Sequence, residues 1–348
     1  MLPNAYIGEG LPPCRSFMIG LMAILEVRDL EVSFGKTRIL RGVSFDLEAG
    51  ETLGVVGESG CGKSMTGFAI MSMLQAPGRI SGGSIKLDGR ELVGLPEREM
   101  RELRGDQIGL VMQDPFTSLN PMMKIGDQIG ESFRLHQGLN RRNAWIKAID
   151  MLEQVGVPAP ESSARKYPHQ MSGGQRQRVV IAMAFASRPK VLIADEPTTA
   201  LDVTLQAQIL RLLKELQERE GTAVMLISHD IGAIAAVSQK IAVFYAGRIV
   251  ETGPAADVLR KSGMPYTRAL LNALPQAGKT RLEAIAGQPP DFNALPTGCA
   301  FSPRCALRIQ ECETEPGLLT LSGRHLSACW RAADVQIIPA GEPVAITT

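Results

Sequence analysis

The chain of 348 residues lacks a long hydrophobic run. No segment reaches the roughly 18 consecutive apolar residues that a membrane-spanning helix needs. The longest early stretch, Phe17 to Leu25, is followed directly by Glu26. No Lys/Arg-rich segment or small-residue cleavage site accompanies it, which argues against a secretory signal. We expect residues 1–23 to be an N-terminal extension, either disordered or the product of a start assigned too early, with Met22 as the true first residue. Any action at a membrane then depends on partners that span it.

The chain also lacks a large net charge of either sign and a visible internal repeat. Lys and Arg total 37 against 36 for Asp and Glu, which gives a formal charge of +1. This balance gives no basic stripe of the kind that binds nucleic acid, and no acidic tail. With 45% apolar and 21% charged residues the composition is that of an ordinary globular protein, and the length suggests two domains.

Short apolar runs alternate with helical patterns over most of the chain. Residues 24–57 predict strands, and Thr52 to Gly57 is a continuous apolar run that ends in glycine, as in a buried parallel strand. A helix should follow Ser64, and a helical insertion is expected over 125–170. Further strands are expected at GGSIKLDG, QIGLVMQ, Lys190 to Asp195, Thr222 to Ser228 and KIAVFYAG, with a helix over 203–220. This alternation predicts an α/β domain with a parallel sheet.

The segment GESGCGKS lies between an expected strand and an expected helix. It fits G-x4-G-K-[ST], whose glycines let backbone N–H groups wrap around phosphates near the positive end of the helix dipole. We expect Lys63 to reach the β- and γ-phosphates of ATP and Ser64 to ligate Mg²⁺. The flanking elements favour this interpretation over a chance glycine-rich loop. The predicted nucleotide-binding residues of this P-loop are Gly57, Glu58, Ser59, Gly60, Cys61, Gly62, Lys63 and Ser64.

Two acidic residues end the apolar run VLIADE. A carboxylate at the carboxyl end of a buried strand can hold Mg²⁺ beside the phosphates, so we assign Asp195 to this role. Glu196 is the candidate general base that polarises the attacking water. Taken alone, the pair is equally well explained as solvated loop acids. Together with the P-loop, the pair indicates a nucleoside triphosphatase.

Three further motifs narrow the class. Ser172-Gly173-Gly174-Gln175 precedes a helix-compatible run, Gln113 ends one expected strand, and His229 follows another. With these motifs in this order between residues 24 and 250, the sequence closely resembles the ATPases of the ABC transporter family. A P-loop kinase accounts for neither the Ser172–Gln175 motif nor His229.

The resemblance implies further roles. Gln113 matches the Q-loop, which contacts Mg²⁺ and the attacking water and faces the transmembrane partner, and His229 matches the switch histidine. Ala200-Leu201-Asp202 match the D-loop. Phe34 lies where the family places an aromatic ring against adenine, although a Phe in a strand is usually core. The signature motif, which in the family closes over the ATP of another subunit, is matched by Ser172, Gly173, Gly174 and Gln175. We therefore expect a dimer, either with a second copy of the chain or with a sister ATPase.

The C-terminal part carries a more specific resemblance. PYTRALL, from Pro265, and the segment from Ala284 to Cys305 are similar to the C-terminal extension of oligopeptide and dipeptide importer ATPases, with Met264 where His is usual. This implies uptake of di- or oligopeptides, with nickel or another small solute as the alternative. A soluble ABC ATPase of repair or translation fits less well, because such proteins carry two ATPase domains or long coiled-coil insertions.

The same resemblance implies the partners and the location. We expect two transmembrane permease subunits and an extracytoplasmic substrate-binding protein, and no nucleic acid. The chain is expected at the cytoplasmic face of the inner membrane, as a peripheral subunit.

Four of the six cysteines lie in the last 50 residues. In a reducing cytosol, clustered thiols favour a metal over disulfides, and four thiolates suit either Zn²⁺ or an iron–sulfur cluster. The resembled importer ATPases carry a [4Fe–4S] cluster at such cysteines, and the C-x2-C pairs of zinc ribbons are missing. Zinc, and thiols that simply pack, remain the alternatives. The predicted cluster ligands are Cys299, Cys305, Cys312 and Cys329.

The predicted fold is an α/β P-loop NTPase of the ABC type. It has a RecA-like core, an antiparallel β subdomain, a helical subdomain over about residues 115–178 and a small Cys-containing C-terminal region. We place the ATP-binding domain at 24–260, the C-terminal region at 261–335 and a tail at 336–348.

Overall fold

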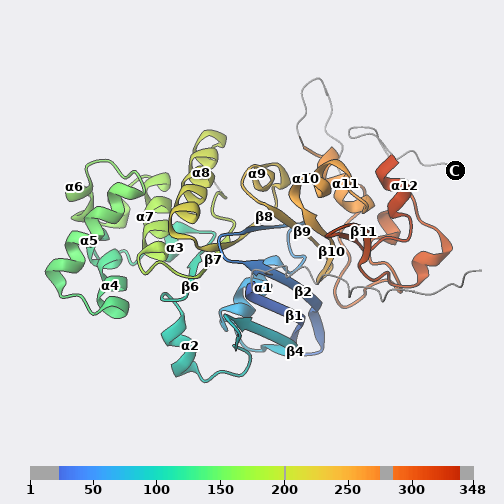
Figure 1. The fold of residues 1–348 in the computed structure, drawn as a ribbon, viewed down its shortest axis with the longest axis horizontal. Coiled ribbons are helices and arrows are strands. Elements are labelled where there is room, and N and C mark those ends of the chain that lie inside the picture. Colours follow the sequence, from blue (N-terminus) through green and yellow to red (C-terminus); the bar gives the residue numbers. More distant parts are fainter. Residues whose placement is uncertain (1–22, 200, 275–284, 338–348) are drawn as a thin grey trace, which may run out of the picture.

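The computed structural model describes residues 23–199, 201–274 and 285–337. Residues 1–22 of the extension expected at 1–23, Ala200 of the D-loop and residues 338–348 of the tail expected at 336–348 lie outside these ranges, whereas Ala23 is already part of a strand and residues 336–337 belong to a helix. Within them, no helix combines the length and the hydropathy that crossing a bilayer requires. Figure 1 shows a helical part at one end, a central sheet, an antiparallel sheet below it and the C-terminal region at the other end.

Most of the central sheet is parallel. Its strand order is β11-β12-β10-β9-β3-β8-β7-β6, and the pairs from β9 to β6 are parallel. These strands are short apolar runs, as expected for strands covered on both faces. Their bounds are β3 Thr52–Val56, β6 Ile108–Val111, β7 Val191–Asp195, β8 Ala223–Ser228 and β9 Lys240–Tyr245. This confirms the strands predicted from the continuous apolar runs.

The central sheet separates two hydrophobic cores. Successive side chains of a strand point to opposite faces, so Leu192 and Ala194 of β7 enter one core while Val191 and Ile193 enter the other. The first core packs against the helical part and the C-terminal region, and the second against the antiparallel sheet. The strand ends that carry the site residues are therefore fixed from both sides.

The antiparallel sheet has the order β2-β1-β4-β5. Apolar side chains such as Leu25 and Val27 face the second core, while Glu26 and Arg28 face away from it, which accounts for the alternating pattern. The elements of this part are β1 Ala23–Phe34, β2 Thr37–Glu48, α1 Lys63–Ile70, β4 Gly78–Leu87, β5 Arg90–Glu91 and α2 Glu97–Leu103. The helix expected after Ser64 is thus present, but it ends at Ile70, before the 41% exposed Met73.

Helices fill the region between Gln113 and β7, at one end of the central sheet, and one more follows each of β7 and β8 (Figure 1). Ile125, Ile129 and Leu152 pack inward, whereas Ile146, an apolar residue of the same helical part, is 49% exposed. The bounds are α3 Pro115–Ser118, α4 Ile125–Gln137, α5 Arg141–Gln154, α6 Pro160–Ala164, η1 Pro168–Gln170, α7 Gly173–Phe185, α8 Val203–Glu220 and α9 Ile231–Ala235. The predicted helices over 125–170 and 203–220 are confirmed.

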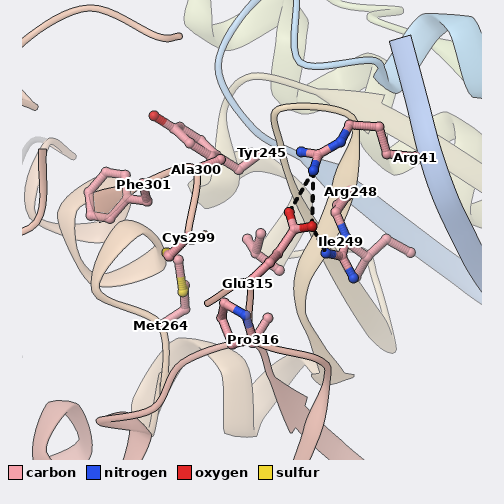
Figure 2. A pocket seen from close by; sticks show the side chains of 12 residues that line it. Arg41, Tyr245, Arg248, Ile249, Met264, Cys299, Ala300, Phe301, Glu315 and Pro316 are labelled. Atoms are coloured by element: carbon pink, nitrogen blue, oxygen red, sulfur yellow. Dashed lines mark hydrogen bonds and ion pairs between the residues drawn. The ribbon is translucent and has the colours of Figure 1, made fainter. Parts of the chain in front are cut away.

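The C-terminal region shares the central sheet. Strand β12 pairs with β10, with Ser327 opposite Glu251, so the sheet runs across the boundary placed at residue 260. The elements are β10 Arg248–Pro254, α10 Ala255–Arg260, α11 Pro265–Asn272, η2 Ser302–Arg304, η3 Gln310–Glu313, β11 Leu319–Ser322, β12 His325–Ser327 and α12 Ala332–Ile337. Figure 2 shows a second link, in which the Glu315 carboxylate binds the guanidinium groups of Arg41 and Arg248.

Candidate active site

The P-loop joins β3 to α1 and curves around its own lysine. The Lys63 side chain is buried and donates hydrogen bonds to the carbonyl oxygens of Gly57, at 2.8 Å, and Glu58, at 2.9 Å. The ammonium therefore lies inside the curve of the loop, at the N-terminus of α1. A lysine placed there can neutralise phosphate oxygens held by the loop amides.

Two glycines of the P-loop are required by its path. Gly57 has φ 153° and Gly62 has φ 108°, backbone conformations that L side chains rarely adopt. A Cβ atom at Gly57 would lie 2.3 Å from the Phe244 carbonyl oxygen, and one at Gly62 would lie 2.7 Å from Cδ2 of Leu40. The glycine pattern of the motif thus reflects both backbone strain and close packing against neighbouring strands.

Asp195 lies at the end of β7, beside the first residues of α1. The Ser64 hydroxyl donates to its Oδ1 at 2.9 Å. Burial raises the pKa of Asp195 and Glu196 adds to the shift, while the bond from Ser64 and the charge of Lys63 oppose it. A hydroxyl and a carboxylate oxygen are ligands that Mg²⁺ accepts, and a cation between them would offset the burial of the carboxylate. The two residues therefore fit the predicted Mg²⁺ ligands.

The carboxylate of Glu196 is the centre of a polar cluster. Its Oε2 accepts hydrogen bonds from the Thr199 hydroxyl at 2.8 Å and from Gln113 Nε2 at 3.1 Å, and His229 Nδ1 lies 3.3 Å away. The Glu196 side chain is 14% exposed, whereas that of His229 is 57% exposed. The ends of β6, β7 and β8 thus bring Gln113, Glu196 and His229 together, as expected from the edge of a parallel sheet.

Sequence reasoning missed Thr199. The residue follows Glu196 by three positions in the run EPTTALD, and such short-range partners of an acid are common in loops and carry no distinctive signal. Glu196 also has φ 47°, and its N–H donates to the Ile227 carbonyl of β8 at 2.9 Å. Non-glycine residues in this strained region often lie at functional sites.

The signature residues form the start of α7. Ser172 caps the helix: its Oγ accepts from the Gln175 N–H at 3.3 Å, and the Gln175 side chain accepts from the Ser172 N–H at 3.1 Å. A Cβ at Gly173 would meet nothing within 4 Å, so the backbone is open there. Within the described ranges, no hydrogen bond or ion pair joins Ser172–Gln175 to the P-loop.

The two remaining predicted residues occupy ordinary structural positions. Asp202 is the N-cap of α8 and accepts from the Leu205 N–H at 2.9 Å. Phe34 ends β1, half-buried, with its ring over Gly78 of β4. Neither is joined to the P-loop by a hydrogen bond or ion pair among the described residues.

The four C-terminal cysteines line one small cavity, together with apolar side chains that include Met264, Phe301 and Leu307. Burial, reinforced by the neighbouring thiols, raises the pKa of Cys305 to about 11 and that of Cys329 to about 12. Thiols with such pKa values stay neutral near pH 7 unless a cation draws off their protons. Among the described residues, however, no three or more His, Cys, Asp or Glu side chains gather in a geometry that holds a metal ion.

Comparison with known proteins identifies the architecture. The ABC transporter family matches residues 40–199, and the oligopeptide/dipeptide transporter C-terminal region matches residues 250–312. The oligopeptide transport ATP-binding protein OppD of Salmonella typhimurium is 47% identical over 317 residues, which cover 89% of this chain and 94% of that protein. The chain belongs to the ABC transporter family. The fold class and the ATPase activity predicted from the motifs are thereby confirmed, as is the need for ATP and Mg²⁺.

Further relatives of this ABC ATPase agree. The dipeptide transport ATP-binding protein DppD of Escherichia coli (strain K12) is 46% identical over 315 residues, which cover 88% of this chain and 96% of that protein. A solved dimeric ATP-binding cassette, in a post-hydrolysis state bound to ADP and Pi, superposes with a TM-score of 0.60 at 26% identity. It covers 66% of this chain and 98% of that one, so this ABC ATPase extends beyond the cassette.

Proposed function

We propose that this ABC ATPase drives the uptake of oligopeptides or dipeptides across the cytoplasmic membrane. The carrying observation is the C-terminal region: residues 250–312 match that of oligopeptide/dipeptide transporters, and the similarity to OppD and DppD extends over most of the chain. Figure 1 places this region at the end of the sheet away from the helical part.

Uptake into vesicles tests the proposal. The chain is co-purified with its partner subunits and placed in vesicles, and labelled dipeptides, longer peptides and Ni²⁺ are offered with ATP. Peptide uptake that is abolished by Glu196→Gln supports the proposal. Uptake of Ni²⁺ with no peptide uptake would contradict the proposal and support the alternative, in which nickel is the solute. ATP hydrolysis without any permease association would indicate an ABC ATPase outside transport.

We propose that Glu196 is the general base for ATP hydrolysis. Its Oε2 is the shared acceptor for Thr199 and Gln113, which fixes the orientation of the carboxylate. His229 contacts the same oxygen and would hold the γ-phosphate and the attacking water in register, while Ser64, Asp195 and Gln113 would hold Mg²⁺. When bound there, Mg²⁺ would neutralise the negative charge of the phosphate oxygens during transfer. The P-loop residues Gly57–Ser64 would bind the triphosphate and Phe34 the adenine.

We propose that the working form pairs two ATPase subunits. The N-terminus of α7 is an anion site, because Gly173 leaves its backbone open and the helix dipole favours negative charge. Since no described contact joins this site to the chain's own P-loop, the ATP it seals would belong to the partner, which is a second copy or a sister ATPase. Asp202 would lie at the same interface. A solved cassette with ADP and Pi is likewise dimeric.

We propose that the permeases dock on the helical part. Next to Gln113, the side chains of Phe116 and Met122 are 64% and 83% exposed. A groove nearby is lined by charged residues and by Trp145 and Ile146 of α5. Exposed apolar side chains beside a groove are typical of a protein interface. This docking would hold the subunit at the cytoplasmic face of the inner membrane, with the substrate-binding protein on the other side.

We propose that the thiols of Cys299, Cys305, Cys312 and Cys329 hold a [4Fe–4S] cluster. The four thiols line one cavity, and four Cys thiolates are the ligand set that such a cluster uses. Zinc, which four thiolates also suit, is the alternative. Iron and sulfide analysis with visible absorption on anaerobically purified protein tests this. Colourless, metal-free and folded protein would leave thiols that only pack.

A further inference from the structure

The P-loop is bound by a residue of the C-terminal region. The Arg304 guanidinium donates to both oxygens of the Glu58 carboxylate, with Nη1 2.7 Å from Oε2 and Nη2 2.9 Å from Oε1. Glu58 is the second residue of the P-loop, so 246 residues separate the partners. The Arg304 side chain is 5% exposed and that of Glu58 is 23% exposed. Such a two-point pair is stronger and more directional than a single ionic contact.

Arg304 is itself held in place. It ends the short helix η2, its Nε donates to the Ala286 carbonyl at 2.8 Å, and its Nη1 lies 3.3 Å from the Tyr245 hydroxyl. The bond to Glu58 raises the pKa of Arg304 further above its ordinary value, so its charge is constant at any physiological pH. Phe301, just before η2, packs edge-on against Tyr245. The guanidinium is therefore preorganised before it meets the P-loop.

The backbone of Glu58 is held by the same region. The Glu58 N–H donates at 2.7 Å to the hydroxyl of Tyr266, which lies on α11 and is fully buried. The Glu58 carbonyl accepts from Lys63 Nζ at 2.9 Å. The amide, carbonyl and side chain of this one residue are thus all engaged, two of them by the C-terminal region and one by the lysine that reaches for phosphate.

We infer that Arg304 and Tyr266 are positioning residues for ATP binding, because they fix Glu58, at the start of the P-loop, and through its carbonyl the Lys63 ammonium. The C-terminal region is then a structural component of the nucleotide site. This inference concerns the ATPase reaction and does not depend on which solute is carried. Neither residue touches the reacting atoms, so both act through Glu58.

The inference predicts that loss of the Arg304–Glu58 pair changes the KM for ATP more than kcat. Glu196, Gln113 and His229 lie at strand ends outside the P-loop, so their cluster does not depend on Arg304. Loss of the Arg304–Glu58 pair frees the part of the P-loop that positions Lys63. Misplacement of a binding group by about 1 Å can lower activity about 100-fold. We expect Arg304→Gln to raise the KM for ATP at least about tenfold and to lower kcat by a smaller factor.

A matched control exists in the same region. Glu315 joins the C-terminal region to the ATPase domain through Arg41, at 2.7 and 3.0 Å, and Arg248, at 2.7 Å (Figure 2). It has no contact with the P-loop among the described residues. Glu315→Gln therefore weakens the attachment of the region without releasing the loop.

The experiment measures ATPase kinetics and ATP affinity in the assembled transporter, and the melting temperature of each purified variant without nucleotide. Support requires that Arg304→Gln and Glu58→Gln each raise KM while Glu315→Gln does not, at comparable losses of melting temperature. Equal changes in KM for all three would overturn the inference, because they would show that the region acts only by holding the fold together.

A double variant and a milder variant complete the test. If Arg304 acts through Glu58, Arg304→Gln combined with Glu58→Gln raises KM no more than the more affected single variant; additive effects would contradict this. Should Arg304→Gln fail to fold, Tyr266→Phe and Glu58→Gln decide the question. Tyr266→Phe removes one hydroxyl, and we expect a higher KM with a smaller fall in melting temperature than Arg304→Gln causes. An unchanged KM in both would overturn the inference.

Discussion

Replacement of Glu196 by glutamine tests the assignment of the general base. The amide is isosteric with the carboxylate, and its oxygen can still accept the hydrogen bond from Thr199, so the cluster with Gln113 and His229 should remain folded. The amide cannot take a proton from water. Loss of a general base slows a reaction by about 100- to 10,000-fold, which corresponds to about 2.7 to 5.4 kcal/mol in the barrier.

ATP binding should survive this substitution. The charge of Glu196 adds to the raised pKa of Asp195, after the larger effect of burial, so removal of that charge favours ionised Asp195 and its binding of Mg²⁺. We therefore expect ATP affinity to be unchanged or higher while phosphate release nearly stops. Affinity is followed by the rise in melting temperature with ATP, and hydrolysis by phosphate release in the assembled transporter.

Glu220 provides the control. Its side chain is 12% exposed, close to the 14% of Glu196, and it pairs with Arg188 and Arg219 away from the P-loop. Glu220→Gln should cost some stability and leave hydrolysis intact. A reduction of the hydrolysis rate by Glu196→Gln of only about threefold or less would refute the assignment, because it is far smaller than the reduction expected for loss of a general base.

Three further predictions concern binding and stability. Lys63→Ala removes the ammonium inside the P-loop, so ATP should no longer raise the melting temperature; unchanged ATP stabilisation would contradict the assigned role. Gly54→Ala should lower the free energy of unfolding, measured by urea titration, by about 1–3 kcal/mol, because its Cβ would lie 2.1 Å from Cγ2 of Ile234. Gly317→Ala, with open space around its Cβ, should leave the free energy of unfolding unchanged. Burial opposes ionisation of Glu91, but hydrogen bonds from Ser84 and from the N–H groups of Ile85 and Val93 outweigh it and lower its pKa. The stability contributed by this carboxylate is present above the unfolded pKa of about 4.3 and is lost as pH falls through the folded pKa. Glu91→Gln should therefore destabilise the chain at pH 7 and cost little at low pH. If the variant and the unmodified chain differed in free energy of unfolding by the same amount at every pH, ionisation of Glu91 would not be the cause.

Sequence patterns predicted the elements whose signal is local. Strands β3, β7 and β8 are continuous apolar runs because both faces are covered, and the glycines of the P-loop are required by its backbone. Short or polar elements carry no such signal: β11 is mostly exposed and β12 has three residues, and both went unpredicted. The helix α2 was missed for a similar reason, since only Met100 and Leu103 are buried in it.

Periodicity also cannot tell which apolar residues find a partner. Ile146 has helical spacing with Ile149 and Leu152, yet it is 49% exposed beside a groove. Long-range contacts were equally invisible. The pairing of Arg304 with Glu58 joins two ordinary surface-type residues at opposite ends of the chain, and nothing in either local sequence indicates the other. Such contacts depend on how the whole sheet brings its edges together.

The pairing of β12 with β10 bears on any shortened form of this protein. Within the described ranges β10 has β9 on one side and β12 on the other. A chain cut ahead of Leu319 would leave the N–H and C=O groups of β10 facing water on that side, where another chain can pair with them. Truncation here would thus expose an unpaired edge strand. Aggregation of such a shortened protein would result from that edge and not from a loss at the nucleotide site.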